Sequence, residues 1–316
     1  MKRTGLLYDE RFLKHRTGAN HPELPERLTA IYNGIRDRGL LEHLQVIPAQ
    51  AAPRMWIETV HDRDYVDRFE AACRNGQESF ESPDNQMCAD TYDVALLAVG
   101  GILDIADRIV NGELDNAFCA VRPPGHHAEK AKAMGFCYFN NVAVAASYLQ
   151  TQWLIERVAI IDFDVHHGNG TQAIFEDDPT VFYYSIHEHP SFAYPGTGRG
   201  FDNGVQRGAG YTRNTTVLPG QGDEFYREAV ENELRPAITH FRPQVIIVST
   251  GFDAHVDDDM ADISLSTAGY AWMMDEIMKL GDRVADGKLI SVLEGGYCLE
   301  RLPELAADHV QALLQI

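Results

Sequence analysis

Basic residues are scarce in this chain of 316 residues. Lys and Arg together number 27 against 47 Asp and Glu, which leaves a formal net charge of −20. General binding to nucleic acid needs a basic face, so this composition argues against that class of function. The same charge is compatible with a cationic substrate, which it would attract, or with the ordinary solubility charge of a cytosolic protein.

Cysteines are also few, and none of them forms a Cys-x-x-Cys pair. The five are Cys73, Cys88, Cys119, Cys137 and Cys298. Cys119 and Cys137 have apolar sequence neighbours, so we expect buried free thiols in a reducing compartment rather than disulfides. A disulfide-stabilised secreted scaffold is therefore not expected.

Long apolar runs are missing as well. No window approaches the length of a membrane span, and the first residues lack the apolar stretch of a signal peptide. We therefore expect a cytoplasmic protein that makes no membrane contact. With 45% hydrophobic residues the chain can bury a large core, and one large α/β domain is as compatible with its length as two smaller ones.

Apolar, β-branched runs alternate with helical patterns along the chain. Strands are expected near residues 4–7, 117–121, 158–164, 181–187, 214–218, 245–251 and 289–294. Helices are expected near residues 24–39, 91–112, 140–154, 223–241, 267–286 and 300–315. This alternation is typical of a parallel sheet with helices on both faces. The segment 187–210, rich in Pro and Gly, is expected to be a long ordered loop.

The most informative strand is the run at 158–164, which ends in Asp164 and is followed by His166. Residues two apart in an extended chain point to the same side. Open α/β sheets bind ligands at the carboxyl ends of their strands, and a carboxylate with an imidazole supplies two of the three ligands of an open zinc site. An Asp that caps the next helix beside a surface His would give the same pattern.

Three further strands end in loops that carry reactive side chains. His126 and His127 follow one strand in a Pro-Gly loop, and imidazoles near a metal suit proton transfer. Asp253 follows a second strand after a glycine, and Tyr297 follows a third after a Gly-Gly turn. Recurrence at four strand ends favours a functional site over a structural coincidence.

These segments resemble the histone deacetylase family. The similar blocks are PPGHHA (residues 123–128), DFDVHHGNGTQ (162–172), GFDAH (251–255) and LEGGY (293–297), in that order. Asn169, where class I members carry Asp, and Glu294 point to the class II branch and its bacterial relatives. The resemblance runs from about residue 7 to 300. It implies one arginase-like α/β domain over residues 1–316, with a central parallel sheet of about eight strands and helices on both faces.

The resemblance also implies a zinc-dependent deacetylase with one Zn²⁺ per active site. Its three protein ligands would be Asp164, His166 and Asp253, with a further position open for water. Such a metal polarises the substrate carbonyl and lowers the pKa of water.

The catalytic residues follow from the same comparison. His127 corresponds to the general base and acid of the family, and His126, paired with Asp162, would help to hold charge in the transition state. Asn169 would meet the Nδ1 side of His127 and fix its tautomer without adding charge. Tyr297 would donate its hydroxyl to the developing oxyanion.

Further positions rest on resemblance alone. The substrate channel would be lined by Phe136, Tyr194, Met260 and Gly295, although a core role for Phe136 is an equal alternative. Arg27 resembles the arginine of the inner channel through which acetate leaves, or it is an ordinary Arg of a first helical turn. Asp84 aligns loosely with an acid of the rim that grips the substrate backbone, or it is a plain loop residue.

A structural K⁺ is likewise implied by the family. One site would use carbonyl oxygens of Asp162, Asp164, His166 and Ile186 with the hydroxyl of Ser185. A second would use Phe175, Asp178, Val181 and Tyr211. Ligands from the backbone leave no signature in the residue types, so only the resemblance proposes these sites.

We therefore expect a zinc amidohydrolase that removes acetyl or short acyl groups from acylated amines. The alternatives are an acetylpolyamine or small-metabolite deacetylase, an arginase-like dinuclear manganese hydrolase, and an inert acyl-lysine-binding module. Met260 falls where a polyamine-selective relative places a gatekeeper Glu, which favours N-acetyl-lysine. Against this stands the acidic run at residues 257–259, which could attract polycations if it faces the rim or could be a solvated turn.

Overall fold

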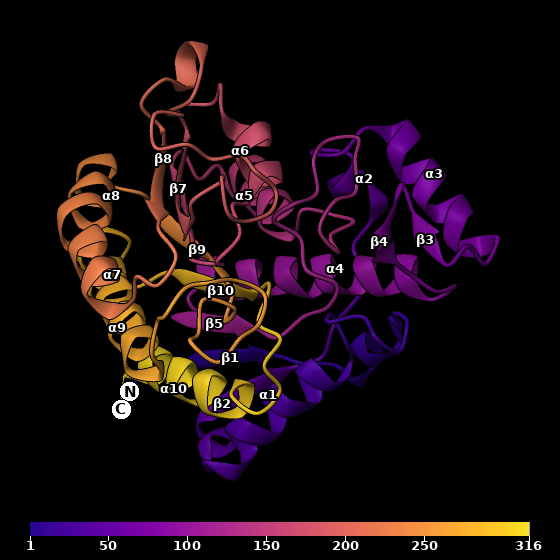
Figure 1. The fold of residues 1–316 in the computed structure, drawn as a ribbon, viewed down its shortest axis with the longest axis horizontal. Coiled ribbons are helices and arrows are strands. Elements are labelled where there is room, and N and C mark those ends of the chain that lie inside the picture. Colours follow the sequence, from indigo (N-terminus) through magenta and orange to yellow (C-terminus); the bar gives the residue numbers. More distant parts are fainter. Residues whose placement is uncertain (316) are drawn as a thin grey trace.

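The computed structural model describes residues 1–315, and its centre is a sheet of eight parallel strands (Figure 1). The strands are β1 (Thr4–Leu7), β2 (Leu44–Ile47), β5 (Asn116–Cys119), β6 (Val158–Asp162), β7 (Val181–Glu188), β8 (Thr212–Val217), β9 (Val245–Thr250) and β10 (Leu289–Leu293). Their order across the sheet is β2-β1-β5-β10-β9-β6-β7-β8. The predicted α/β class with a parallel sheet of about eight strands is confirmed, and the seven predicted strands end within two residues of the observed ones.

Helices cover both faces of the sheet. They are α1 (Glu26–Asp37), α2 (Arg54–Ile57), α3 (Arg63–Arg74), α4 (Thr91–Val110), α5 (Asn141–Trp153), α6 (Asn169–Phe175), α7 (Asp223–Ala229), α8 (Arg235–Phe241), α9 (Thr267–Val284) and α10 (Leu302–Leu314). Three 3₁₀ turns, at Glu10–Lys14, Leu40–His43 and Gln206–Gly208, and a π-helical segment at Val230–Leu234 complete the helical elements among the described residues.

Strand β1 shows how the two helical layers are arranged. The Thr4 hydroxyl donates to the carbonyl of Leu313 in α10. The Leu7 side chain, three residues on and so on the opposite face, packs against Gly101 of α4. Helices α1, α9 and α10 pack together on the first face, and α4 and α5 pack together on the second (Figure 1).

Most of the strands that the sequence analysis predicts are buried between the two layers of helices. Every residue of β1, β5, β6, β7, β9 and β10 is buried, and such strands read as continuous apolar runs. The edge strand β2 buries only Ile47, and the amphipathic helix α3 is strongly charged on its outer side. Strand β2 lies outside the prediction because it has almost no buried face, whereas α3 has a clear buried face, with Tyr65, Val66 and Phe69 on it, that the prediction missed.

The four strands that carry the predicted site lie side by side. Strands β5, β10, β9 and β6 are neighbours in the middle of the sheet, and all run in the same direction. Their carboxyl ends therefore meet at one edge. Each is followed there by one of the four loops that the sequence analysis selected, which is the usual place for a ligand in an open α/β sheet.

Two smaller segments lie around this edge. One is an antiparallel pair of short strands, β3 (Ser79–Phe80) and β4 (Ser82–Gln86). The other is the connection between β7 and β8, the long loop that the Pro and Gly content predicts. As for membranes, the helices among residues 1–315 are too short or too polar to cross one.

Candidate metal and catalytic centre

Three metal-ligating side chains meet where β6 and β9 end. They are Asp164, His166 and Asp253, all buried, with ligand atoms that lie within 4.8 Å of one another. His166 Nδ1 is 3.1 Å from Asp164 Oδ1 and 3.2 Å from Asp253 Oδ2. They are the three ligands that the resemblance implies. Across residues 1–315 no second group of three His, Cys, Asp or Glu side chains has this geometry.

The donor set fits a tetrahedral zinc ion. Zinc binds carboxylate oxygen and imidazole nitrogen at about 2.0–2.1 Å, so two ligands of a tetrahedral site lie about 3.3 Å apart. The two separations from His166 Nδ1, 3.1 and 3.2 Å, agree with that value. Burial and the neighbouring charge of Asp164 raise the pKa of Asp253 to about 6. A divalent cation between the two carboxylates would offset this repulsion.

Beside the triad, His127 is held in one tautomer. Its Nδ1 lies 2.8 Å from Asn169 Oδ1, the contact that the resemblance predicts. Asn169 Nδ2 donates to Glu129 Oε1 at 2.8 Å, which determines the end of the amide that faces the ring. Nδ1 therefore carries the proton and Nε2 keeps its lone pair. Burial and the nearby charge of His126 lower the pKa of His127 well below its usual value.

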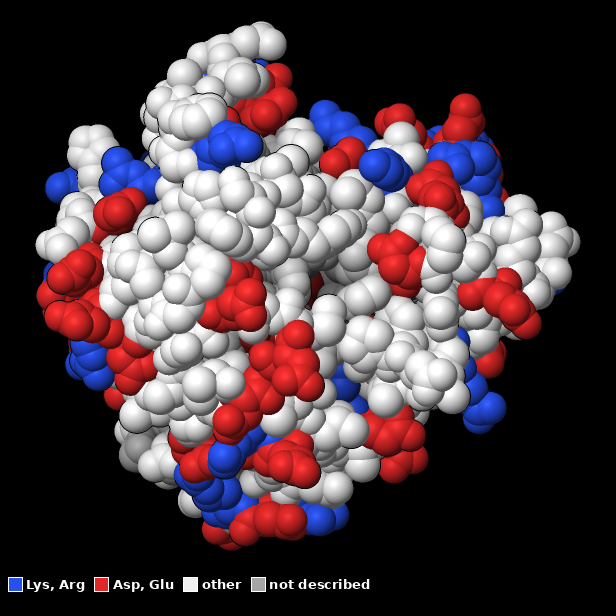
Figure 2. Space-filling model, in the orientation of Figure 1, with Lys and Arg blue, Asp and Glu red and all other residues white. Residues whose placement is uncertain are grey.

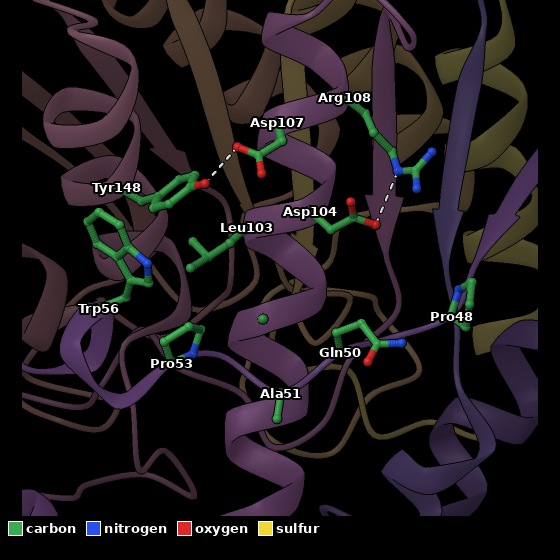
Figure 3. Close-up of a pocket in the computed structure, with 11 residues that line it drawn as sticks. Pro48, Gln50, Ala51, Pro53, Trp56, Leu103, Asp104, Asp107, Arg108 and Tyr148 are labelled. Atoms are coloured by element: carbon green, nitrogen blue, oxygen red, sulfur yellow. Dashed lines mark hydrogen bonds and ion pairs between the residues drawn. The ribbon is translucent and has the colours of Figure 1, made fainter.

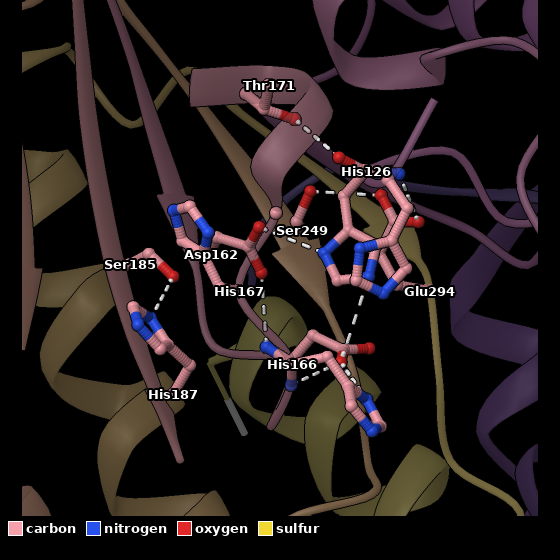
Figure 4. A network of polar contacts seen from close by, with 12 residues as sticks. His126, Asp162, His166, His167, Thr171, Ser185, His187, Ser249 and Glu294 are labelled. Carbon is pink, nitrogen blue, oxygen red and sulfur yellow. Dashed lines mark hydrogen bonds and ion pairs between the residues drawn. The ribbon is translucent and has the colours of Figure 1, made fainter. Parts of the chain in front are cut away.

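The neighbouring His126 lies in a different electrostatic environment. Its Nδ1 lies 3.1 Å from Asp162 Oδ2 (Figure 4). The same oxygen accepts a hydrogen bond from the Tyr183 hydroxyl at 2.9 Å. Burial disfavours the charged ring, but Asp164 and Asp162 outweigh it and raise the pKa of His126 to about 10. The two histidine rings are 4.0 Å apart. The pKa values of these two adjacent imidazoles are therefore shifted in opposite directions next to the metal ligands.

Glu294 is a buried carboxylate to which the sequence reasoning gave no role. Its Oε2 accepts hydrogen bonds from the backbone N–H groups of Gly125 at 2.7 Å and His126 at 3.1 Å. Its Oε1 accepts from the Ser249 hydroxyl at 3.0 Å (Figure 4). Glu294 thus ties the histidine loop to β9 and β10. An acid that directly follows an apolar strand, inside a block already selected, was the signal that could have found it.

A narrow cavity of about 250 Å³ leads to this centre. The residues that line it are Asp84, His127, Gly135, Phe136, His166, Tyr194, Met260 and Tyr297. The space-filling view shows a small hollow near the middle of this face, with acidic side chains beside it (Figure 2). Four of the positions predicted for the channel and its rim therefore line the same cavity. They are Phe136, Tyr194, Met260 and Asp84.

Phe136 is placed in the cavity by an unusual backbone conformation. Its φ of 69° lies in the left-handed region, which bulky residues rarely adopt. The preceding Gly135 (φ 53°) lies so close to His127 that a Cβ there would meet the ring at 2.2 Å. The Phe136 N–H donates to the buried Asn85 Oδ1 at 3.0 Å. Residues in such a strained conformation cluster at functional sites. This favours Phe136 as a wall of the cavity over Phe136 as a core residue.

The Tyr194 wall belongs to the loop after β7, which two buried histidines anchor. His167 Nδ1 lies 2.9 Å from the Thr197 hydroxyl, and His187 Nε2 lies 2.8 Å from the Gly198 carbonyl. His187 Nδ1 also contacts the Ser185 hydroxyl at 2.8 Å (Figure 4). Both histidines lie outside the ligand triad.

Arg27 is fully buried behind Tyr297. Its Nε donates to the Gly296 carbonyl and its Nη2 to the Glu294 carbonyl, each at 2.6 Å. Its guanidinium lies 4.7 Å from the centre of the Tyr297 ring, and its Nη1 pairs with Glu23 at 2.9 Å. Arg27 is therefore a buried residue beside the site, and its place in an inner channel stays a prediction from the family.

Gly295 is another position that the resemblance predicts for the channel. It does not line the cavity. Its N–H donates to Asp164 Oδ2 at 2.8 Å, and a Cβ at this position would meet Asp253 Oδ2 at 2.1 Å. Gly295 therefore packs directly against two of the metal ligands, where only a residue without a side chain fits.

The residues proposed for potassium lie in two groups near β6 and β7. Asp162 and Ser185 are register partners in these neighbouring strands, and Ile186 follows. In the second group, the Phe175 carbonyl accepts from the Asp178 N–H at 2.9 Å, and the Tyr211 carbonyl accepts from the Tyr183 N–H at 2.9 Å. Val181, the remaining residue of that set, begins β7. Occupation by K⁺ stays a prediction from the family.

A larger hollow of about 450 Å³ lies away from the triad, between the loop at residues 48–53, α2, α4 and α5 (Figure 3). Its charged and hydroxyl groups form two pairs. The Tyr148 hydroxyl donates to Asp107 Oδ1 at 2.7 Å, and Arg108 Nε donates to Asp104 Oδ2 at 3.1 Å. None of the residues selected from the sequence lines it, so we assign the chemistry to the smaller cavity.

A parallel α/β sheet with a metal-ligating triad and a histidine pair at the carboxyl ends of its strands defines a class, the metal-dependent α/β hydrolases. Comparison with known proteins narrows the class. The sequence model of the histone deacetylase domain matches residues 21–313. The chain therefore belongs to the histone deacetylase family of deacetylases and amidohydrolases.

Individual relatives agree with this assignment. A probable deacetylase of Archaeoglobus fulgidus is 39% identical over 300 residues, which cover 94% of this chain and 82% of the relative. A histone deacetylase-like amidohydrolase of Pseudomonas aeruginosa is 35% identical, over 96% of this chain and 83% of the relative. A crystal structure of the HDA15 HD domain superposes with a TM-score of 0.92 at 36% identity, covering 99% of this chain and 88% of that one.

Proposed function

We propose that this protein is a zinc-dependent amidohydrolase that removes acetyl or short acyl groups from amines, with N-acetyl-lysine as its preferred substrate. The observation that carries the proposal is the pairing of one metal triad with a neutral histidine whose Nε2 is free. Asp164, His166 and Asp253 would hold the zinc ion. When bound there, zinc would act as a Lewis acid on the substrate carbonyl and lower the pKa of water.

The side chains around the triad divide the remaining work. His127 Nε2 would take the proton of the attacking water and return it to the departing amine, because its Nδ1–H is already committed to Asn169. The charged His126 and the Tyr297 hydroxyl would stabilise the negative charge that develops on the carbonyl oxygen. Phe136 and Tyr194, which line the cavity, would exclude water around an unbranched acyl-lysine stem.

Two other activities are distinguishable on the same protein. A dinuclear manganese hydrolase would need a second set of ligands, whereas residues 1–315 contain one such group. An inert acyl-lysine-binding module would need no general base beside the triad. The contacts of His127 with Asn169, which leave its Nε2 unprotonated, argue against such a module. Metal analysis of the purified protein together with an acetyl-lysine peptide assay separates these three. Two metals per chain, or a zinc-loaded but inactive protein, would contradict the proposal.

The Tyr297 hydroxyl provides a test of oxyanion stabilisation. Tyr297→Phe removes one donor and is expected to lower kcat roughly 10²–10³-fold, the usual effect of losing one oxyanion donor. Zinc content and melting temperature should not change, because the ring and its contact with Arg27 remain. A loss of kcat below about threefold would show that the hydroxyl does not face the oxyanion, since that is far below the effect of one donor.

Substrate choice is tested at the cavity entrance. Met260 lines the cavity and offers an apolar contact, which suits the neutral stem of acyl-lysine and gives nothing to the internal ammonium of an acetylpolyamine. We expect a higher kcat/KM on an acetyl-lysine peptide than on N-acetylated polyamines. Met260→Glu should narrow the gap, because a carboxylate attracts the internal ammonium. Met260→Gln, which has the same length without the charge, is the matched control.

The same assay tests the alternative function, an acetylpolyamine deacetylase. If the unmodified enzyme turns over acetylpolyamines faster than peptides, the preferred substrate is wrong while the amidohydrolase assignment stands. Acidic side chains lie beside the hollow in Figure 2, and negative charge there would attract a polycation. Acetylpolyamines must therefore be compared with peptides. Longer acyl chains on the same peptide would define the acyl-chain preference.

A further inference from the structure

The acidic run after the metal ligand Asp253 is not uniform. Asp257 and Asp259 are exposed, whereas Asp258 between them is 5% exposed. Asp257 pairs with Arg301 Nε at 2.6 Å at the surface. Three identical side chains therefore have different surroundings. A buried carboxylate is costly unless it accepts hydrogen bonds, so the contacts of Asp258 indicate why it is there.

Asp258 accepts three hydrogen bonds from backbone N–H groups. Its Oδ2 accepts from Tyr297 at 2.6 Å and from Cys298 at 2.9 Å. Its Oδ1 accepts from Met260 at 3.1 Å. Tyr297 and Met260 both line the substrate cavity. One carboxylate thus connects two cavity walls that come from different loops.

The backbone before Tyr297 needs such support. Gly295 and Gly296 precede it, and Gly296 has a φ of 110°, a conformation that glycine adopts freely and other residues rarely do. On one side, the Gly296 carbonyl is held by Arg27 Nε at 2.6 Å. On the other side, Asp258 holds the N–H groups of Tyr297 and Cys298. Without Asp258 the loop loses one of these two attachments.

We propose that Asp258 is a positioning residue that sets the Tyr297 hydroxyl for catalysis and the Met260 side chain for substrate selection at the same time. It acts through the backbone of both loops and does not line the cavity itself. The proposal rests on the amidohydrolase function described above. Neither a rim attractor nor a solvated turn describes Asp258, because this central acid of residues 257–259 faces inward while its two neighbours are exposed.

Asp258→Asn is the substitution that tests it. The amide is the same size, but its NH₂ group would face N–H donors, so at least one of the three bonds is lost. We expect kcat on an acetyl-lysine peptide to fall roughly 10- to 100-fold, the loss expected for hydrogen bonds to a charged group. KM and zinc content should change little. Asp259→Asn, the same change at the exposed neighbour, should leave kcat unaltered.

A double substitution separates positioning from a general structural role. If Asp258 acts through the hydroxyl of Tyr297, Asp258→Asn should lower kcat by less than about twofold in a Tyr297→Phe enzyme, because coupled residues are not additive. If the two losses multiply, the proposal is overturned. Asp258→Asn should also change the ratio of peptide to acetylpolyamine turnover, as a displaced Met260 requires.

Hydrogen–deuterium exchange gives a readout that does not depend on turnover. The amides of Met260, Tyr297 and Cys298 should exchange faster in Asp258→Asn than in the wild-type protein or in Asp259→Asn. Unchanged exchange with unchanged kcat would overturn the proposal. Faster exchange in Asp258→Asn, together with a wild-type protein that shows no deacetylase activity, would instead reject the proposed function and keep the positioning role of Asp258. If Asp258→Asn does not fold, Asp258→Ser, which keeps one acceptor oxygen in a smaller side chain, takes its place in each measurement.

Discussion

Replacing Asp253 with alanine is expected to abolish both metal retention and amidohydrolase activity. Asp253 is one of only three ligands in the triad, and its Oδ2 lies 3.2 Å from His166 Nδ1. Two remaining ligands would leave an incomplete zinc site, since catalytic zinc generally has three protein ligands. Zinc content by elemental analysis and kcat/KM on an acetyl-lysine peptide measure the two effects in the same sample.

The control for this variant is Asp259→Ala on the same loop, which removes an exposed acid. It should retain one zinc per chain and full activity. Circular dichroism of Asp253→Ala is needed as well, because Asp253 Oδ1 also accepts from the Val165 N–H at 3.0 Å. A folded Asp253→Ala protein that works at full rate without its metal would refute the ligand assignment.

His127→Ala is expected to have the second largest effect, with a different signature. A positioned general base contributes roughly 10²–10⁴-fold, so kcat should fall by that factor. Zinc should be retained, because His127 is not one of the three ligands. Loss of turnover with the metal in place distinguishes a base from a ligand, and parallel zinc analysis of both variants shows the difference directly.

His126→Ala is the matched comparison, because it removes the same side chain from the adjacent position. Asp164 and Asp162 raise the pKa of its ring to about 10, which favours the charged form and a role in stabilising charge rather than accepting a proton. We expect a smaller loss of kcat than for His127→Ala. An essential His126 beside a dispensable His127 would mean that the two roles are reversed.

Much of the fold follows from burial on two faces. Strands such as β6 and β9 are buried along their whole length and so appear in the sequence as continuous apolar runs. The edge strand β2 is mostly exposed and has no such run. The order of the strands is set by long-range packing that no local pattern records. That order places β5, β10, β9 and β6 side by side and so brings the four motifs together.

The residues of the candidate site likewise include some that the sequence reveals and others that only the tertiary structure reveals. Asp164 and His166 are visible in the sequence because a strand end and a spacing of two define their geometry. Other residues depend on tertiary contacts. Asp258 looks like its neighbours until its buried partners are known, and Gly295 has no side chain from which to infer a role. Arg27 is recognisable as unusual only when its burial against backbone carbonyls is seen.

The most direct test of the central claim is a metal titration of the metal-free protein. Zinc is added in steps, and bound zinc and turnover of an acetyl-lysine peptide are measured at each step. The account predicts that activity rises from zero and reaches its maximum at one zinc per chain, in keeping with the single triad of residues 1–315. Activity in the metal-free protein, or a maximum reached only with two manganese ions per chain, would contradict it.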